Sequence, residues 1–284
     1  MKETSQYHSK VTKLQVIFAA ARVAVTAVFL IYSSWSDYKT REVSNRVWAF
    51  YAPIALALSL SELLLYEPSS LPIFGLSVGL TTAFALLLFY TGGFGGADSK
   101  AFMCIALALP FFPEVLIKPM LPEGLSPLSQ TIFPLTILSN AVLIAAASGL
   151  YLLLSNLTKR VTTGRKLFEG TLTKDSLGKK ILVLITGKKY SIATLKAKWH
   201  IYPMEDIEEE TIENSVKRKL VVVPRDEGRD KIVERLSKAV DSGKISDGVW
   251  ATPGLPMLIF VAIGLLVALV FGDIVWVLVS HLLG

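Results

Sequence analysis

The sequence predicts an all-α polytopic membrane protein: six transmembrane helices with a small cytoplasmic α+β insertion between helices five and six. Three observations support this fold class. Hydrophobic residues make up 52% of the 284 residues and charged residues only 18%, whereas soluble proteins carry about a quarter charged residues. Six apolar stretches approach the length of about 20 residues that crosses a bilayer as a helix. Finally, 20 of the 29 Lys and Arg residues are concentrated in residues 156–250.

The six predicted spans cover residues 14–36, 47–66, 71–91, 101–118, 131–155 and 254–283. The fourth is interrupted by Pro110 and Pro113, so we expect it to be short or kinked. We expect the first to be a retained helix and not a signal peptide, because Arg22 interrupts its apolar core and no small-residue cleavage site follows. The Arg22 side chain is predicted to extend toward the outer headgroups. Cys104 is predicted to pack as a small apolar side chain.

Residues 156–250 differ in composition from the rest of the chain. Strand-like runs are predicted at 181–185, 190–194 and 220–223, and an amphipathic helix is predicted within 226–240. Together they predict a small α+β domain outside the membrane. The predicted organisation is therefore residues 1–155 with helices one to five, residues 156–250 as a cytoplasmic soluble domain, and residues 251–284 with helix six.

The distribution of basic residues predicts the orientation. Loop 37–46 and the residues directly after the fifth span are rich in Lys and Arg, whereas loops 67–70 and 119–130 contain none. By the positive-inside rule, loops 37–46, 92–100 and 156–250 face the cytoplasm and both termini lie outside. Three lysines near the N-terminus oppose this assignment but are outnumbered. Topology thus explains the net charge of +6, so we expect the lipid bilayer as a partner and no nucleic acid.

Two aspartates beside the spans are the candidate catalytic residues. Asp37 ends the first span, and Asp98 precedes the fourth and follows a glycine-rich run at 92–97. The predicted topology places both at the cytoplasmic side, where they can meet at one depth. Two carboxylates within hydrogen-bonding reach share one proton. Such a pair can activate a water and polarise a peptide carbonyl, which is the chemistry of aspartic proteases.

Other interpretations of these residues stay open from the sequence. Asp98 could serve only as a helix cap, Asp37 could be a solvated interfacial charge, and the glycine run could be a plain turn. A small secondary transporter or proton pathway could also use paired carboxylates, although the sequence has no inverted repeat. A third alternative is a non-catalytic membrane anchor for residues 156–250. With a single cysteine and no metal-ligand spacing, we expect no metal site and no cofactor.

Two short segments resemble the motifs of a known family. Residues 37–45 (DYKTREVSN) and, about 50 residues later, 95–100 (GGADSK) are similar to the two motifs of the GxGD membrane aspartic proteases, specifically the type IV prepilin peptidase group. Six spans and a soluble segment before the last one resemble the archaeal preflagellin peptidases in particular. One position departs from the pattern, because Ala97 occupies the place where the family has glycine.

The resemblance implies an aspartic endopeptidase of the plasma membrane. Its substrates would be preflagellins or prepilins, including proteins of the archaeal flagellum, with a short basic class III leader that is cleaved on the cytoplasmic side, typically after a glycine. Asp37 and Asp98 match the catalytic pair, and Gly95, Gly96 and Ala97 match the substrate-binding glycine segment. Bacterial relatives often carry a cysteine-rich zinc loop linked with N-methylation, which a chain with one cysteine cannot form.

An acidic run provides one further expectation. Glu205, Asp206, Glu208, Glu209, Glu210 and Glu213 occur without an intervening Lys or Arg. The simpler interpretation is a solvated helix face. The alternative hypothesis is that this run attracts the basic leader of the substrate, in which case the effect would weaken with salt.

Overall fold

The computed structural model describes residues 13–164, 166–208, 216–222, 228–254 and 256–283. The chain forms two compact units: Met1–Ile144 together with Pro256–Gly284, and Ala145–Leu255. Helix α6 begins in the first unit and continues into the second.

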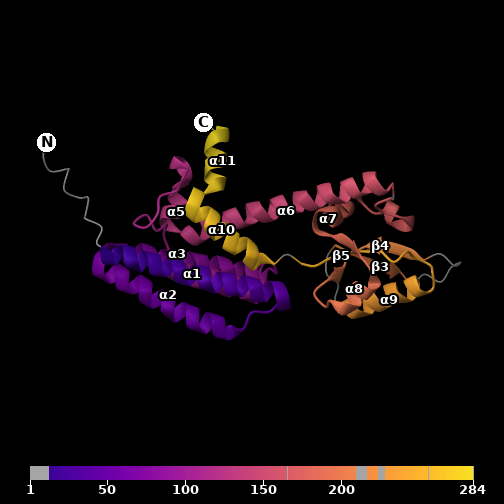
Figure 1. Ribbon diagram of the computed structural model, residues 1–284, viewed down its shortest axis with the longest axis horizontal. Coiled ribbons are helices and arrows are strands. Elements are labelled where there is room, and N and C mark those ends of the chain that lie inside the picture. Colours follow the sequence, from indigo (N-terminus) through magenta and orange to yellow (C-terminus); the bar gives the residue numbers. More distant parts are fainter. Residues whose placement is uncertain (1–12, 165, 209–215, 223–227, 255, 284) are drawn as a thin grey trace. The chain divides into compact units, whose positions relative to one another are not determined.

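The secondary structure described in the first unit is helical, and α1 runs beside α2 (Figure 1). Its α-helices are α1 (Lys13–Thr40), α2 (Asn45–Tyr66), α3 (Leu71–Tyr90), α4 (Gly96–Ala108), α5 (Pro127–Thr131), the first part of α6 (Phe133–Thr163), α10 (Met257–Phe271) and α11 (Ile274–Leu283). Single 3-10 turns at Pro68–Ser70 and Pro122–Gly124 complete it.

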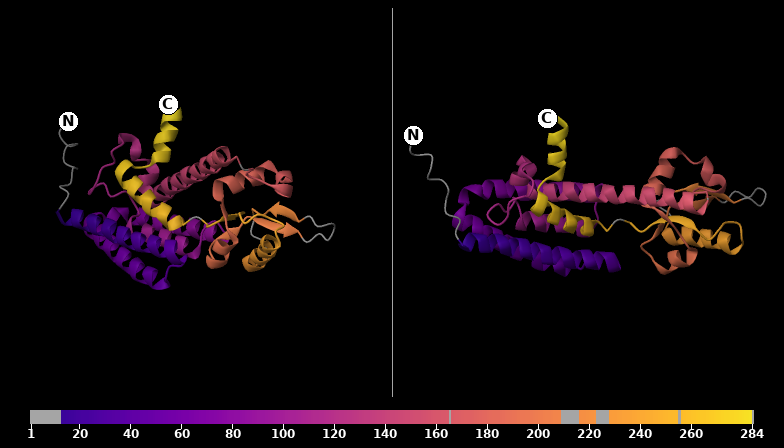
Figure 2. Two further views of the ribbon diagram at one scale, coloured as in Figure 1. Left: turned by 45° about the vertical axis from the view of Figure 1, so that its right-hand side comes forward. Right: turned by 45° about the horizontal axis from the view of Figure 1, so that its top comes forward.

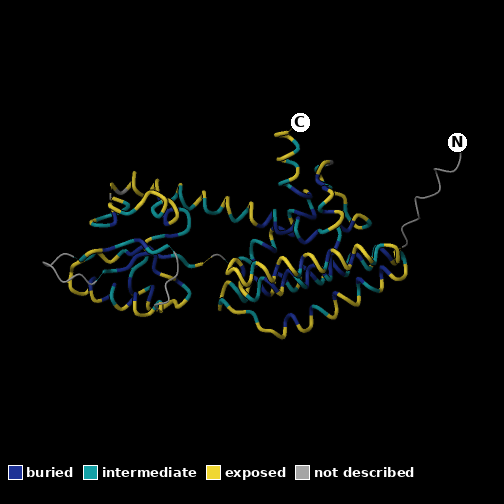
Figure 3. Tube along the Cα trace, turned by 180° about the vertical axis from the view of Figure 1, so that it is seen from behind, coloured by how far each residue is buried: buried dark blue, intermediate teal, exposed yellow. Residues whose placement is uncertain are grey.

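Length and composition identify the helices that can cross a membrane. Among the described residues, four helical segments qualify: Lys13–Thr40, Asn45–Tyr66, Pro68–Tyr90 and Phe133–Thr162. A fifth span results if α10 and α11, which are bent by 58° at a short break, count as one. Buried and exposed residues alternate along α1, α2 and α3 (Figure 3), whereas α11 has no buried residue. The described residues thus contain four or five candidate spans, which agrees with a multi-pass helical membrane protein.

Helix α4 is the main difference from the six predicted spans. It has 13 residues, which at 1.5 Å per residue extend only about 20 Å and fall short of the hydrocarbon thickness. Its last helical hydrogen bond runs from Leu109 N to Ile105 O, because Pro110 cannot donate the next one. The prolines therefore shorten this element, as the sequence indicates, and residues 109–118 are not helical.

Side chains from three helices bind carbonyl groups at the end of α4 and just beyond it. Ser59 of α2 donates to Leu107 O at 2.6 Å, and Ser77 of α3 donates to Pro110 O at 2.9 Å. Such carbonyls have no partner within a helix and require another donor when they are buried. The third donor, which binds Ala108 O at 3.1 Å, is Arg22 of α1.

Arg22 does not extend to the headgroups, and that expectation was wrong. Its side chain is buried, and Nε lies 2.8 Å from Oε2 of Glu62 on α2. The physical reason lies in the end of α4, which provides a buried acceptor at the same level of the bundle. A guanidinium has five N–H donors, so it can bind Glu62 and the carbonyl together.

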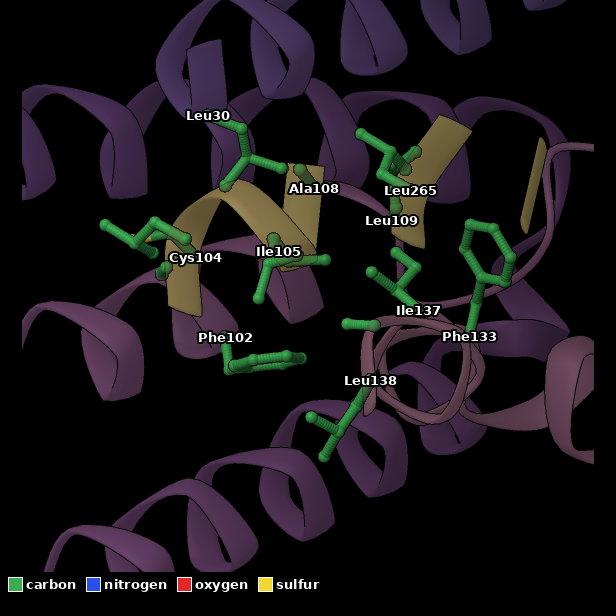
Figure 4. Packing of buried hydrophobic residues seen from close by; sticks show 14 of the residues in the cluster. Leu30, Phe102, Cys104, Ile105, Ala108, Leu109, Phe133, Ile137, Leu138 and Leu265 are labelled. Carbon is green, nitrogen blue, oxygen red and sulfur yellow. The ribbon is translucent and has the colours of Figure 1, made fainter. Parts of the chain in front are cut away.

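The hydrophobic core of this unit surrounds α4. Phe102 and Ile105 of α4, with Leu109 directly after it, pack with Leu30 of α1 and Leu265 of α10 (Figure 4). Cys104 is a free, buried thiol in the same cluster, as expected for a small apolar side chain. The core therefore fixes the short helix whose first turn carries Asp98.

The second unit combines a long helix with two small sheets (Figure 2). Its elements after α6 are a 3-10 turn at Gly170–Lys174, α7 (Leu177–Thr186), β1 (Lys188–Tyr190), α8 (Ile192–Ala197), β2 (Tyr202–Pro203), β3 (Glu205–Glu208), β4 (Lys217–Leu220), α9 (Arg229–Asp241) and β5 (Val249–Thr252). The strands form an antiparallel sheet of order β1-β5-β2 and an antiparallel pair β3-β4. This is the small α+β region that the sequence predicts.

Individual elements of this unit differ from the prediction. The predicted strand 181–185 is part of helix α7. The hydroxyl of Ser176 caps the first turn of this helix by accepting a hydrogen bond from Lys179 N. A short continuous apolar run does not distinguish a strand from a buried helix. The predicted strand 190–194 is replaced by the last residue of β1 and the start of α8, whose cap is Ser191.

The two remaining predictions fall closer to the structure. The strand predicted at 220–223 is shifted toward the N-terminus, because β4 ends at Leu220, and residue 223 lies outside the described residues. The amphipathic helix predicted within 226–240 corresponds to α9. Its buried residues Ile232, Val233 and Leu236 have the spacing that led to the prediction.

The acidic run is not a solvated helix face in its described part. Glu205 and Asp206 belong to β3 and are buried, with Arg218 bound to Glu205 at 2.7 Å and Arg235 to Asp206 at 2.9 Å. Burial raises the pKa of Glu205, and Arg218 opposes this shift. Each buried charge requires such a partner. Residues 209–215, which include the other three glutamates beyond Glu208, lie outside the described residues.

Candidate active site

Asp37 lies in the last turn of α1 and is partly buried. Its carbonyl oxygen accepts a hydrogen bond from Arg41 N at 3.0 Å. Arg41 has φ +58°, in the left-handed region that commonly ends helices. Thr40 stabilises the same turn by donating to Ser36 O at 2.9 Å. The end of α1 is therefore locally ordered around Asp37.

Asp98 is the third residue of α4. Its Oδ2 accepts a hydrogen bond from Gly95 N at 3.0 Å, so the carboxylate reaches back over the first turn as in half of a capping box. A Cβ at Gly95 would lie 3.2 Å from the same oxygen. Glycine thus allows the carboxylate to approach the backbone closely at this point.

The turn between α3 and α4 holds the first turn of α4 against α3. Gly92 has φ +77°, which a residue with a side chain rarely adopts. The amides of Gly93 and Phe94 both donate to Leu88 O, at 2.7 and 3.0 Å. Buried Ser99 donates to Ala85 O at 3.2 Å. Ser99 is a positioning contact that sequence reasoning missed, because no pattern indicated its partner.

A hydrogen bond joins the two segments that carry the aspartates. Nζ of Lys100 donates to Oδ1 of Asn45 at 2.6 Å. Asn45 begins α2, after the loop that follows Asp37, and Lys100 lies two residues beyond Asp98. The sequence names both residues as parts of their motifs but gives no sign that they bind each other.

The two aspartates are within electrostatic reach. The pKa of Asp98 is raised to about 6, chiefly by burial. The hydrogen bond from Gly95 opposes this shift, and the negative charge of Asp37 adds to it. A neighbouring like charge that raises a carboxyl pKa is the condition under which a pair retains one proton near neutral pH. The arrangement can therefore present a carboxylate and a carboxylic acid together.

The remaining candidate residues, Gly96 and Ala97, directly precede Asp98 in the chain. A Cβ at Gly96 would lie 3.7 Å from the Phe89 ring, which is ordinary van der Waals contact. Ala97 is partly buried and packs against the hydrophobic core. Its methyl group thus has a place in the structure, although the resemblance predicts glycine there.

The fold and the aspartate pair have the features of a membrane aspartic endopeptidase. Comparison with protein-family models identifies the family. Residues 24–154, which contain both aspartates, match the Type IV leader peptidase family, and residues 179–274 match the Archaeal Peptidase A24 C-terminus Type II. The chain therefore belongs to the type IV leader peptidase family of aspartic endopeptidases, with the archaeal form of the C-terminal region.

A curated relative supports the same assignment over nearly the whole chain. The preflagellin peptidase of Methanococcus voltae is 25% identical over 256 residues, which cover 88% of this chain and 94% of the relative. Membership of a peptidase family favours the protease interpretation over the transporter and the anchor. It also implies substrates of the prepilin kind.

Proposed function

We propose that this protein removes the short basic leader peptide of preflagellins or prepilins, with Asp37 and Asp98 as the catalytic pair. The observation that carries this proposal is geometric: Lys100, two residues beyond Asp98, donates a hydrogen bond at 2.6 Å to Asn45, the last residue of the motif that begins with Asp37. Burial chiefly raises the pKa of Asp98, and the charge of Asp37 adds to this shift. Both residues also lie within the region that matches the peptidase family. The relative from M. voltae carries the name preflagellin peptidase, which supports the substrate class.

The proposed mechanism uses one proton on the pair. The ionised aspartate removes a proton from a bound water, which attacks the peptide carbonyl, while the protonated aspartate donates a hydrogen bond to the carbonyl oxygen. The tetrahedral intermediate then collapses with cleavage of the C–N bond, the pair transfers the proton taken from water to the leaving amine, and one proton remains on the pair. No covalent intermediate forms between substrate and enzyme. The coupled pair titrates as a unit, so the roles of Asp37 and Asp98 are assigned to the pair and not to either residue.

The glycine-rich segment is proposed to receive the substrate backbone. Gly95, Gly96 and Ala97 follow the turn that precedes α4 and have at most one methyl group as a side chain. An extended peptide could approach their backbone closely. Lys100 and Asn45 would hold this segment at a fixed distance from the end of α1, through the hydrogen bond described above.

The membrane topology is proposed from the charge distribution. Helix α4 would be a short fourth element within the membrane, and α10 with α11 would form a bent final span, which makes six. Loop 37–46, the turn before α4 and residues 156–250 would face the cytoplasm, with both termini outside. The active site would then lie at the cytoplasmic face of the plasma membrane.

The direct test is cleavage of a substrate with a prepilin-type leader by the full-length protein in detergent. Asp37→Asn and Asp98→Asn keep the size of each side chain but remove the carboxylate. We expect wild type to release the leader and each variant to lose at least about 1,000-fold in kcat/KM, because neither amide can exchange the shared proton.

A matched control shows whether the loss is specific to the pair. Glu114 is an exposed carboxylate in the segment after α4, so Glu114→Gln makes the same chemical change away from the pair and should cleave like wild type. Circular dichroism must show that all variants keep their helical content. Normal cleavage by either aspartate variant would remove that residue from the proposed pair.

A further inference from the structure

A basic cavity lies entirely within the second unit and has a volume of about 830 Å³. The described residues that define its chemistry are Lys159, Arg160, Lys166, Lys189, Glu169 and Trp250. One further carboxylate, Asp247, also lines it. Four cations therefore face two carboxylates, which leaves a net charge of +2 in one concave site.

Both carboxylates of the cavity already have partners. Glu169 Oε1 lies 3.4 Å from Nζ of Lys189. Asp247 Oδ1 accepts a hydrogen bond from Ile192 N at 2.8 Å. Arg160 and Lys166 form no ion pair with any carboxylate in the described part of the chain. Their positive charges are therefore available to an anion that enters the cavity.

One residue that lines the cavity is a buried aromatic side chain held by several contacts. The Trp250 side chain is 1% exposed, stacks on Phe168 with ring centroids 5.4 Å apart, and donates through Nε1 to Leu167 O at 3.1 Å. Nζ of Lys189 lies 5.9 Å from the centroid of the Trp250 ring. A cavity lined by cations and one aromatic ring suits a ligand with one anionic end and one less polar end.

The cavity adjoins the end of a candidate membrane span. Arg160 and Lys159 lie in the last turns of α6, and residues Phe133–Thr162 of that helix are apolar enough to cross a bilayer. The positive-inside rule accounts for basic residues near such an end. It does not account for their convergence, with a lysine from β1, on a single cavity.

We propose that this cavity binds the phosphate of an anionic lipid headgroup. Lysine and arginine at the membrane surface attract acidic headgroups, and a guanidinium can bind two phosphate oxygens at once. The site is independent of the aspartate pair and of the peptidase reaction. It would make retention of acidic lipids a property of the second unit.

The test measures the lipids that the full-length protein retains. The protein is purified in detergent with equal amounts of phosphatidylglycerol and phosphatidylcholine, and bound lipid is counted by native mass spectrometry. We expect selective retention of phosphatidylglycerol by wild type. In Arg160→Gln/Lys166→Gln, apparent affinity should fall about 30-fold, from two lost charges at a membrane surface.

A charge-matched variant separates the cavity from general attraction. Lys196 and Lys198 are exposed on the same unit and away from this cavity, so Lys196→Gln/Lys198→Gln should retain the lipid like wild type. Equal loss in both double variants would overturn the site, and so would wild-type protein that shows no preference between the two lipids. Inorganic phosphate that displaces the lipid at equal concentration would overturn the lipid source in favour of a free-phosphate site.

Discussion

The buried ion pair between Arg22 and Glu62 allows a quantitative prediction about the stability of the helical bundle. Arg22→Met removes the charge but keeps much of the apolar stem. The carboxylate of Glu62 then loses its partner, and Ala108 O loses its bond from the guanidinium. Ser59 still donates to Ala108 O at 3.2 Å, so the carbonyl is not left without a donor.

The size of the effect follows from the geometry. Nε and Oε2 are 2.8 Å apart, and each side chain is 9% exposed. At an effective dielectric constant of about 20, the attraction is about 6 kcal/mol. Desolvation of the two ions offsets most of this, because it costs several kcal/mol for each. Removal of one partner keeps the cost for the other, so we expect Arg22→Met to lower the free energy of unfolding by about 3–5 kcal/mol.

The assay is a denaturant titration of the detergent-solubilised protein, followed by circular dichroism. The double variant Arg22→Met/Glu62→Met removes both charges and should lose only about 1 kcal/mol, because apolar replacements of a buried pair are often nearly neutral. Arg46→Met makes the same change at an exposed arginine and should stay within about 0.5 kcal/mol of wild type. If the double variant is as unstable as Arg22→Met, the reasoning about an unpaired buried charge is wrong.

Three further predictions concern the site around Asp98. The pKa of Asp98 is raised to about 6, so the shared proton is present at low pH and is lost as the pH rises through 6. We therefore expect kcat/KM to fall about tenfold for each pH unit above 6. A flat pH profile up to pH 9 would contradict this prediction. Lys100→Met should lower kcat/KM about tenfold or more with unchanged unfolding, while Lys100→Arg retains most activity, because the lysine binds Asn45 across the site. Gly92→Ala should lower the free energy of unfolding by about 1–2 kcal/mol, because Gly92 has a positive φ. Gly79 lies in open space within α3, so Gly79→Ala should be neutral or stabilising. Equal effects of the two substitutions would refute the argument from the positive φ.

Much of the membrane architecture could be predicted from the sequence because its signals are local. Apolar stretches of the right length identify the long helices, and the prolines after Ala108 indicate a short α4. The helix α9 was predicted well because its buried positions repeat with helical spacing. Strand 181–185 was predicted wrongly because a continuous apolar run carries no period, and the cap at Ser176 was overlooked.

The candidate site was only partly predictable for a related reason. Motifs and topology select Asp37 and Asp98, since both depend on short segments and on charge counts in loops. The contacts around them, between Lys100 and Asn45 and between Ser99 and Ala85, join residues that are 55 and 14 positions apart in the chain. Pairings of this kind depend on packing, for which one sequence gives no direct signal.

The role of Arg22 at the end of α4 is one feature that the sequence does allow one to infer. A helix that stops at Pro110 inside an apolar bundle leaves carbonyl groups that need donors. In the described part of the chain, Phe133 N binds Pro110 O at 3.0 Å, and the side chains of Arg22, Ser59 and Ser77 from α1, α2 and α3 supply the further donors. The early end of α4 and the polar residues in the other spans therefore belong together, because these residues bind the carbonyl groups that the helix end leaves without partners. A short helix that carries a catalytic candidate at its start requires such donors at its end, because they fix its position along the bundle.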